Sequence, residues 1–127
     1  MTIISISLPD ELLEEIEKLI REQNFSGRSD VVRAGAKMLI ADCKEKARLE
    51  GSLNSVLLVI HPQNVEDTVT EIKHEFEDII STQIHNHLRK DTCLEIFILE
   101  GDADRVKELV RMLQTCGKMD LVKLIVA

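Results

Sequence analysis

Three of the four histidines and one of the three cysteines lie within the stretch from His74 to Glu95. Imidazole nitrogens and thiolate sulfurs are ligands for nickel, copper, zinc or cobalt rather than for magnesium or calcium. His85 and His87 are two residues apart in a segment whose β-branched content favours a strand, and side chains two apart on a strand share one face. The spacing therefore predicts two imidazoles that point the same way, as a transition-metal site requires.

The turn after the histidine pair determines where a third ligand can come from. Residues 89–92 are polar and predict a hairpin turn, so residues 93–99 return antiparallel to the histidine strand. Cys93 begins that second strand, which brings its thiol beside the two imidazoles. We therefore expect His85, His87 and Cys93 to converge within one hairpin, as two nitrogen ligands and one sulfur ligand.

Three further residues near the hairpin have open roles. His74 belongs to the preceding helical pattern, so its imidazole reaches the hairpin only through a tertiary or quaternary contact. Glu95 shares the strand face of Cys93, where its carboxylate either orients a ligand histidine through the ring N–H or is an ordinary solvent-facing charge. His61 precedes Pro62 at a strand end and is either an accessory ligand or, as the favoured interpretation, an exposed loop histidine.

The four candidate ligands are separated by intervals of eleven, two and six residues, and Leu-Glu follows the last of them: they are His74, His85, His87 and Cys93. This pattern resembles the nickel-responsive ribbon-helix-helix regulators (NikR family). The resemblance implies a planar four-coordinate site with one Ni(II) per subunit, to which one chain contributes three ligands and a neighbouring chain contributes His74. A planar site suits Ni(II) or Cu(II), so nickel selectivity is expected to come from geometry and metal supply.

The N-terminal part of the chain is predicted to form a short strand and two helices. Residues 2–8 alternate between two faces, which predicts a strand, and a helix with an apolar stripe opens at Asp10. After a turn that contains Gly27, Ser29 is predicted to cap a second helix that runs to about Arg48. Such a unit cannot enclose a core alone, so a partner chain is expected.

This strand, helix and helix order resembles the ribbon-helix-helix DNA-binding domain. The resemblance implies that strands from two chains pair into a ribbon that enters the major groove of double-stranded operator DNA, while the start of the second helix holds a phosphate. The base-reading positions are then Ile3, Ser5 and Ser7, and the phosphate-side positions are Arg28, Ser29 and Arg33. Ile3 stands where better-known members have arginine, and isoleucine offers a base only apolar contact, so the operator sequence is not carried over.

Residues 50–54 break the helical pattern and predict a linker between two domains, residues 1–50 and residues 55–127. The second domain is predicted in the order βαββαβ, at residues 55–61, 65–76, 79–88, 93–99, 103–116 and 120–126. This is the order of a ferredoxin-like domain, and it resembles the ACT-type domain that the nickel regulators use for assembly. We therefore expect an α+β protein, with an N-terminal ribbon-helix-helix unit (βαα) and an ACT-like unit that forms a homotetramer, a dimer of dimers.

The composition of the 127 residues limits the alternatives. A net charge of −7 argues against a protein that coats nucleic acid nonspecifically, but not against specific binding. No apolar run approaches the length of a membrane span and no export signal is visible, so we expect a cytoplasmic protein without a membrane partner. The three cysteines predict no disulfide framework, and Cys43 and Cys116 fall in helical patterns where a small core residue is expected.

Together the two resemblances imply a nickel-responsive transcription regulator, a repressor whose operator binding is promoted by metal at an inter-subunit site. Two alternatives stay open: a ribbon-helix-helix regulator whose ACT-like domain senses a small metabolite, and one that responds to another transition metal such as copper. An enzyme is not expected, because four protein ligands leave no open metal position and no nucleophile–base arrangement is recognisable.

Overall fold

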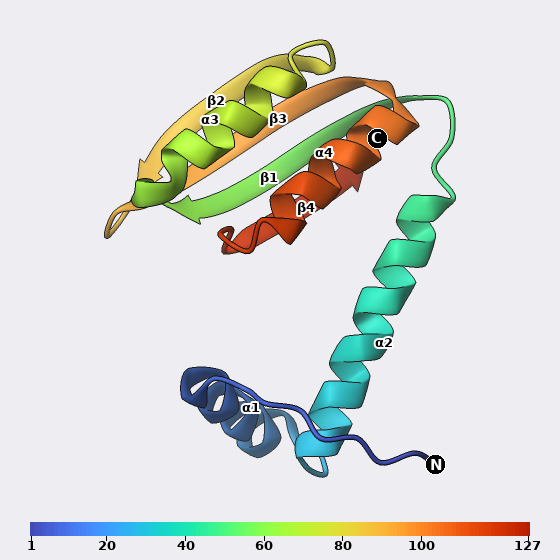
Figure 1. Cartoon of the computed structure of the whole chain (residues 1–127), viewed down its shortest axis with the longest axis vertical. Coiled ribbons are helices and arrows are strands. Elements are labelled where there is room, and N and C mark those ends of the chain that lie inside the picture. The colour runs from blue at the N-terminus through green and yellow to red at the C-terminus, as the bar shows by residue number, and fades with distance from the viewer. The chain divides into compact units, whose positions relative to one another are not determined.

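The computed structural model describes all 127 residues, which separate into two units, Met1–Arg48 and Leu49–Ala127 (Figure 1). The first unit contains two helices, α1 (Asp10–Gln23) and α2 (Arg28–Ala47). Helix α1 carries acidic residues in its first turn, where the helix dipole favours negative charge. It ends at Asn24, whose left-handed conformation (φ 60°) is a common way to terminate a helix.

Residues 1–9 form no strand, so the strand predicted over residues 2–8 is not present in the single chain. A strand is held by hydrogen bonds to a neighbouring strand, and the rest of this unit is helical. Ile3, Ile4 and Ile6 are accordingly exposed to 94%, 77% and 56%. A two-chain ribbon takes its hydrogen-bond partner from another subunit, which is the physical reason why one chain does not show it.

The start of α2 also differs from the prediction. Ser29 is not the helix cap, because the helix begins at Arg28 and Gly27 occupies the N-cap position. No side chain caps this end of the helix. Oδ2 of Asp30 instead accepts the backbone N–H of Ser26, in the turn before the helix, at 3.3 Å. Helix α2 buries none of its residues, and the prediction of a core cysteine at Cys43 is wrong for the single chain, where it is exposed.

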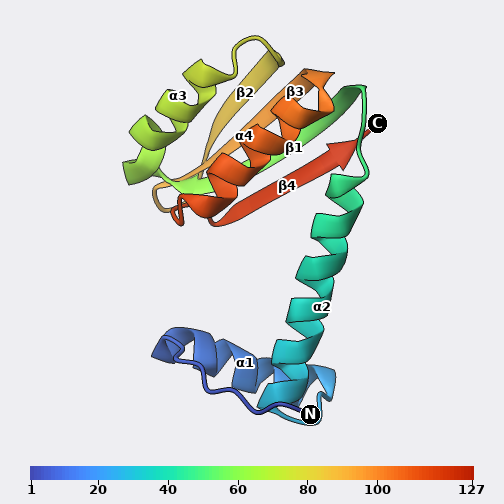
Figure 2. The ribbon, with the colours of Figure 1, turned by 45° about the vertical axis from the view of Figure 1, so that its right-hand side comes forward.

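The second unit is built on a four-stranded antiparallel sheet with the order β2-β3-β1-β4. Figure 2 shows these strands side by side, with β2 at one edge and β4 at the other. Their bounds are β1 Ser52–Pro62, β2 Ile80–Leu88, β3 Thr92–Asp102 and β4 Leu121–Val126. The predicted α+β class and βαββαβ order are confirmed.

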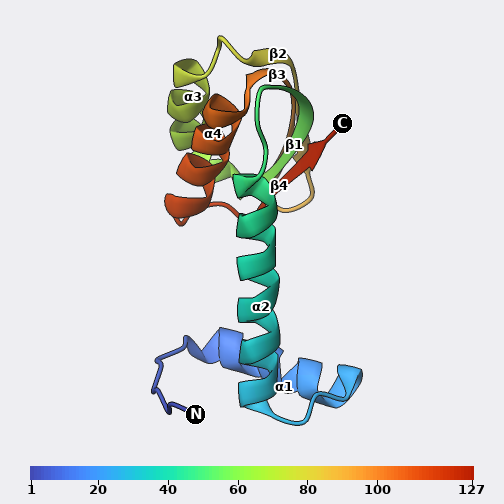
Figure 3. The same ribbon diagram turned by 90° about the vertical axis from the view of Figure 1, so that its right-hand side faces the viewer.

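Helices α3 (Glu66–Glu75) and α4 (Ala103–Thr115) lie on one face of this sheet (Figure 3). The short 3-10 helix η1 (Gln63–Val65) leads from β1 into α3. Asp102 caps α4, because its carboxylate accepts the backbone N–H of Asp104 at 3.0 Å. None of the helices combines the length and the apolar composition that crossing a lipid bilayer requires.

The core lies between the two helices and the sheet. Alternate residues of β1 and β3 are buried, as the two-residue period of a strand dictates. The fully buried core side chains include Leu57, Val59, Phe76, Leu99, Val106, Leu109 and Leu113. At one end of the same face this apolar series gives way to His61 on β1 and to Cys93 and Glu95 on β3, which are equally buried. The alternation that builds the core therefore also directs these three side chains inward.

The opposite face of the sheet carries apolar side chains that no helix of this unit covers. Its exposed members, which we call the open sheet face, are Ile84, Leu88, Ile98, Leu121 and Ile125, with exposures of 38–51%. Contiguous exposed apolar surface of this kind is typical of an interaction site rather than of a surface that faces water.

Candidate metal centre

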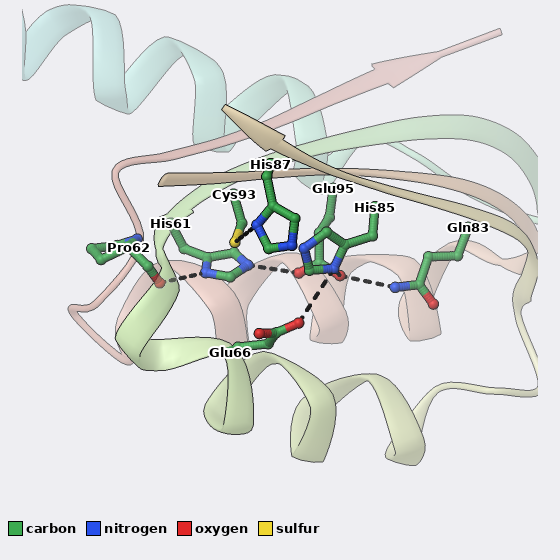
Figure 4. Close-up of polar contacts among 8 residues, drawn as sticks. All are labelled: His61, Pro62, Glu66, Gln83, His85, His87, Cys93 and Glu95. Carbon is green, nitrogen blue, oxygen red and sulfur yellow. Dashed lines mark hydrogen bonds and ion pairs between the residues drawn. The ribbon is translucent and has the colours of Figure 1, made fainter. Parts of the chain in front are cut away.

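The hairpin of β2 and β3 brings three candidate ligands together. His87 is the cross-strand partner of Cys93, and His85 is that of Glu95. Ligand atoms of His85, His87 and Cys93 all lie within 4.8 Å of one another. Nδ1 of His87 lies 3.7 Å from Sγ of Cys93 (Figure 4). Two imidazoles and one thiol this close together form a donor set that fits a transition-metal ion such as nickel.

The turn between the two strands sets this register. Lys90 and Asp91 both have positive φ values of 55°, the conformation that tight hairpin turns demand and that aspartate tolerates better than most residues. The carbonyl of Asp91 also accepts the backbone N–H of Gln63 at 2.6 Å, which ties the turn to the end of β1. With the turn fixed, the pairing of His87 with Cys93 follows.

Cys93 is fully buried, although it lies at the start of its strand. Burial raises the pKa of the Cys93 thiol, and the negative charges of Glu66 and Glu95 raise it further. A thiolate is the form that binds metal. A metal ion held by Cys93 would therefore have to displace the thiol proton, so protons and metal would compete for the same sulfur.

Glu95 is not a solvent-facing charge, and that alternative is wrong: the residue is only 2% exposed. Its Oε2 lies 2.8 Å from Nε2 of His61, its Oε1 accepts the N–H of Gln83 Nε2 at 2.8 Å, and Nδ1 of His85 lies 3.6 Å from Oε1. The burial of Glu95 could have been predicted from the sequence, because Glu95 falls in the same alternation as Phe97 on the buried face of β3.

His61 is not an exposed loop histidine, and the favoured interpretation is wrong. Strand β1 continues through Pro62, so His61 lies inside the sheet as the cross-strand partner of Cys93 and is 0% exposed. Its Nδ1 lies 2.8 Å from the carbonyl oxygen of Pro62 and its Nε2 faces Glu95. Both ring nitrogens are therefore engaged with oxygen atoms, which leaves neither of them directed at the three candidate ligands.

His74 is not brought to the cluster of its own chain. It lies on α3, it is exposed, and its Nδ1 is 2.6 Å from Oε1 of Glu77. A residue that sequence reasoning missed is Glu66, the first residue of α3, whose Oε1 lies 3.5 Å from Nδ1 of His85. No spacing rule pointed to it, because the contact joins a helix start to the hairpin and follows only from the tertiary fold.

Two family models together match most of the chain. The model described as the NikR C-terminal nickel-binding domain matches residues 55–127, and the model described as the ribbon-helix-helix protein, copG family, matches residues 2–42. The chain belongs to the nickel-responsive regulator family. This family consists of transcription factors and not of enzymes, and its ribbon-helix-helix domain is a DNA-binding module.

Relatives assigned as nickel-responsive regulators match this chain along almost its whole length. The Methanocaldococcus jannaschii protein is 38% identical over 124 residues, which is 95% of this chain and 88% of that protein. The Methanococcus vannielii protein is 36% identical over 126 residues, or 97% of this chain and 89% of that protein. The Methanothrix thermoacetophila protein is 32% identical over 124 residues, or 95% and 89%.

Two solved structures resemble the fold of part of this chain. One is an uncharacterized protein from Thermotoga maritima, with a TM-score of 0.55 and 18% identity over 60% of this chain and 98% of that chain. The other is the C-terminal domain of the MgtC protein from Mycobacterium tuberculosis, with a TM-score of 0.51 and 14% identity over 63% and 93%. At these identities the likeness concerns the fold alone.

The residues that resemblance assigns to DNA contact are all exposed in the ribbon-helix-helix unit. They are Ile3, Ser5 and Ser7 before α1, and Arg28, Ser29 and Arg33 in the first turns of α2. Nε of Arg28 lies 2.6 Å from Oε1 of Glu17 on α1. An exposed pair of this type contributes at most about 1 kcal/mol, so the guanidinium can leave Glu17 at little cost.

Proposed function

We propose that this family member is a nickel-responsive repressor that acts in the cytoplasm. One Ni(II) per subunit is held by His85, His87 and Cys93 of one chain together with His74 of a neighbouring chain, and its binding promotes binding to double-stranded operator DNA. The observation that carries the proposal is the convergence of two imidazoles and one thiol in the β2–β3 hairpin. Nickel, when bound, would join His74 of one chain to the hairpin ligands of another.

The bridging role of His74 is supported by what surrounds it. The imidazole is exposed on α3 and contacts only Glu77 of the same chain, which is itself exposed. It is therefore accessible to a second chain, and leaving an exposed partner costs little. With His74 added, the donor set becomes three nitrogens and one sulfur, which completes four-coordination without any further residue.

Assembly into a tetramer, as a dimer of dimers, is supported by two apolar surfaces. The apolar surface of the C-terminal unit is the open sheet face. The apolar surface of the N-terminal unit consists of the exposed isoleucines before α1 together with Met38, Leu39 and Ile40 of α2. Apolar surface gains about 25 cal/mol per Å² when it is removed from water. We assign the N-terminal surface to the two-chain ribbon and its helices, within a DNA-binding domain of residues 1–50. The open sheet face then assembles the metal-binding domains, residues 55–127.

On this assembly, operator DNA meets the paired ribbons through Ile3, Ser5 and Ser7, and phosphates meet Arg28, Ser29 and Arg33. A nickel ion that joins two chains favours one arrangement of the ribbons. If nickel tightens operator binding by some factor, operator DNA must tighten nickel binding by the same factor. Measuring both equilibria therefore tests the coupling from two directions.

Subunit mixing tests the bridging site directly. His74→Ala leaves the three hairpin ligands intact, and His85→Ala leaves His74 intact, so a mixed oligomer regenerates complete four-ligand sites only if His74 acts across chains. The expected result is that mixing restores the absorption band of the complete four-ligand site, which neither variant shows alone, after subunit exchange has been verified with labelled chains. Lys73→Ala, on the same turn of α3, should behave as wild type. Absence of the band despite verified exchange contradicts the proposal.

The coupling to DNA is tested with duplexes selected from a random pool by the nickel-loaded protein. Wild type should bind the selected duplexes more tightly with nickel than without it. His74→Ala should still take up nickel but should lose most of this difference, because its metal no longer joins two chains. Equal nickel dependence in wild type and His74→Ala would count against regulation through the bridge.

A further inference from the structure

Glu66 brings a second carboxylate to the ring of His85. Its Oε1 lies 3.5 Å from Nδ1 of His85, and Oε1 of Glu95 lies 3.6 Å from the same nitrogen. The two carboxylates come from different elements, since Glu66 begins α3 and Glu95 lies on β3 (Figure 4). A single ring nitrogen is thus faced by oxygen atoms from both the helix side and the sheet side.

The two carboxylates differ in how free they are to hold that nitrogen. Both oxygens of Glu95 already have close partners, because Oε1 accepts from Gln83 and Oε2 meets His61, each at 2.8 Å. Glu66 has His85 as its one ion-pair partner, and its side chain is 44% exposed. Its carboxylate can therefore follow the imidazole as the ring adjusts, whereas Glu95 is held in place.

We propose that Glu66 is a positioning residue of the metal centre: its carboxylate accepts the Nδ1–H of His85 and leaves Nε2 as the ligand atom. This inference rests on the proposed function. Figure 4 shows the second ring nitrogen of His85 turned toward His87, which is the side on which the other candidate ligands lie. A carboxylate that holds one ring N–H of a ligand histidine fixes the tautomer and ring orientation and makes the other nitrogen a stronger donor.

The charge of Glu66 also acts on the rest of the centre. It is one of the two carboxylates whose negative charge raises the pKa of the Cys93 thiol, after the larger effect of burial. A divalent cation bound at the centre would be attracted by the same negative charge. Glu66 thus favours the metal-bound state both through the orientation of His85 and through its own field.

Nickel affinity of the full chain, measured with NiCl₂ against a competing chelator, tests the role. Glu66→Ala should weaken binding about tenfold, which is the lower end of the range for residues that orient a ligand histidine. Glu66→Gln should fall between wild type and Glu66→Ala, because the amide oxygen still accepts the ring N–H without the charge. Asp67→Asn is the matched control: it removes the same charge from the same first turn of α3 at an exposed position and should leave the affinity unchanged.

The ring tautomer of His85, read from ¹⁵N shifts of the metal-free protein, separates positioning from a merely structural effect. Wild type and Asp67→Asn should show a protonated Nδ1, and Glu66→Ala should shift toward a mixture of tautomers. An unchanged tautomer and affinity in Glu66→Ala overturns the inference, and so does an equal loss in Asp67→Asn. Glu66→Gln as weak as Glu66→Ala, with an altered nickel absorption spectrum, would make Glu66 a ligand and would also overturn it.

The same measurements keep this inference apart from the proposed function. If wild type binds no nickel, the proposed function fails, whereas the tautomer comparison in metal-free protein still shows whether Glu66 controls His85. If wild type binds nickel and Glu66→Ala binds it equally well with an unchanged ring, only the role of Glu66 fails.

Discussion

Nε2 of His61 lies 2.8 Å from Oε2 of Glu95, and both residues are buried, at 0% and 2% exposure. The contact joins β1 to β3 next to Cys93, which is the cross-strand partner of His61. A polar pair in such a position is costly to break, because the remaining partner is left buried without its hydrogen bond. The pair therefore links the stability of the sheet to the surroundings of the candidate ligands.

The first prediction concerns this pair. Glu95→Leu and His61→Leu should each lower the free energy of unfolding by about 3 kcal/mol, because each leaves one buried atom of the other residue, His61 Nε2 or Glu95 Oε2, without its partner. The double variant should lose much less than the sum of the two, since it removes both polar groups together. Urea denaturation of metal-free wild type, the two single variants and the double variant gives the four free energies of unfolding. Strictly additive losses would show that the two side chains are not coupled.

The second prediction concerns Cys93, the only cysteine in the ligand cluster. Cys93→Ala should abolish the thiolate-to-nickel absorption band, whereas Cys43→Ala and Cys116→Ala should retain it. Nickel affinity of wild type should also rise with pH, by about tenfold per pH unit while the thiol is still protonated. The sign follows from the competition of proton and metal for the sulfur. The raised pKa of the Cys93 thiol extends this pH dependence to higher pH. A band lost with Cys43→Ala or Cys116→Ala instead would contradict the assignment.

The third prediction separates base contacts from phosphate contacts. Ser5→Ala combined with Ser7→Ala should lower affinity for a selected duplex by about 1–3 kcal/mol and leave the salt dependence nearly unchanged, because neither serine carries a charge. Arg33→Ala should weaken binding to all duplexes and reduce the salt slope by about one unit. Binding isotherms at several salt concentrations distinguish the two. If both variants changed the salt slope alike, the proposed docking of the ribbon would be wrong.

The fourth prediction concerns Arg105, which connects α4 to the end of α3. Its guanidinium hydrogen bonds to Asp78 at 2.8 Å and lies 4.3 Å from the centre of the Phe76 ring. The hydrogen bond from Arg105 is the main reason why the pKa of Asp78 is lowered from its ordinary value of 3.8. A lowered pKa gives stability that is present above pH 3.8 and is lost as the pH falls through the folded-state value.

Arg105→Gln should accordingly lower the urea midpoint at pH 7, and the gap to wild type should narrow below pH 3.8, where Asp78 loses its charge. It should not close completely, because the contact with Phe76 does not titrate. Arg111→Gln, on the same helix, removes a guanidinium without these contacts and should show no pH-dependent gap. A gap of constant size at all pH values would mean that the ion pair contributes nothing.

Local patterns were sufficient for much of the metal-binding unit. The two-residue spacing of His85 and His87, followed by a polar turn and Cys93, determines which side chains share a face once the strands pair. The order of strands and helices could be predicted for the same reason, since each element has its own hydrophobic period. The hairpin ligands lie close in sequence, so short-range rules suffice to bring them together.

What sequence reasoning missed depends on contacts between distant segments or between chains. The burial of His61 was missed because the strand was predicted to end at His61, before Pro62, whereas it continues through Pro62. Glu66 meets His85 only after α3 has packed on the sheet. The strand expected at residues 2–8 would need a partner from a second chain, and the single chain shows none.

The confinement of His85, His87 and Cys93 to one hairpin has a consequence for the order of folding. Hairpins close in about 1–10 μs, whereas the pairing of Ser55 with Val126 must wait for nearly the whole C-terminal unit. During synthesis the hairpin is complete before β4 has been made. A lone hairpin is only marginally stable, so an ion that bound its candidate ligands at this stage would stabilise it by mass action. Chains made with and without available metal would therefore begin to differ at this hairpin, before any second subunit is encountered.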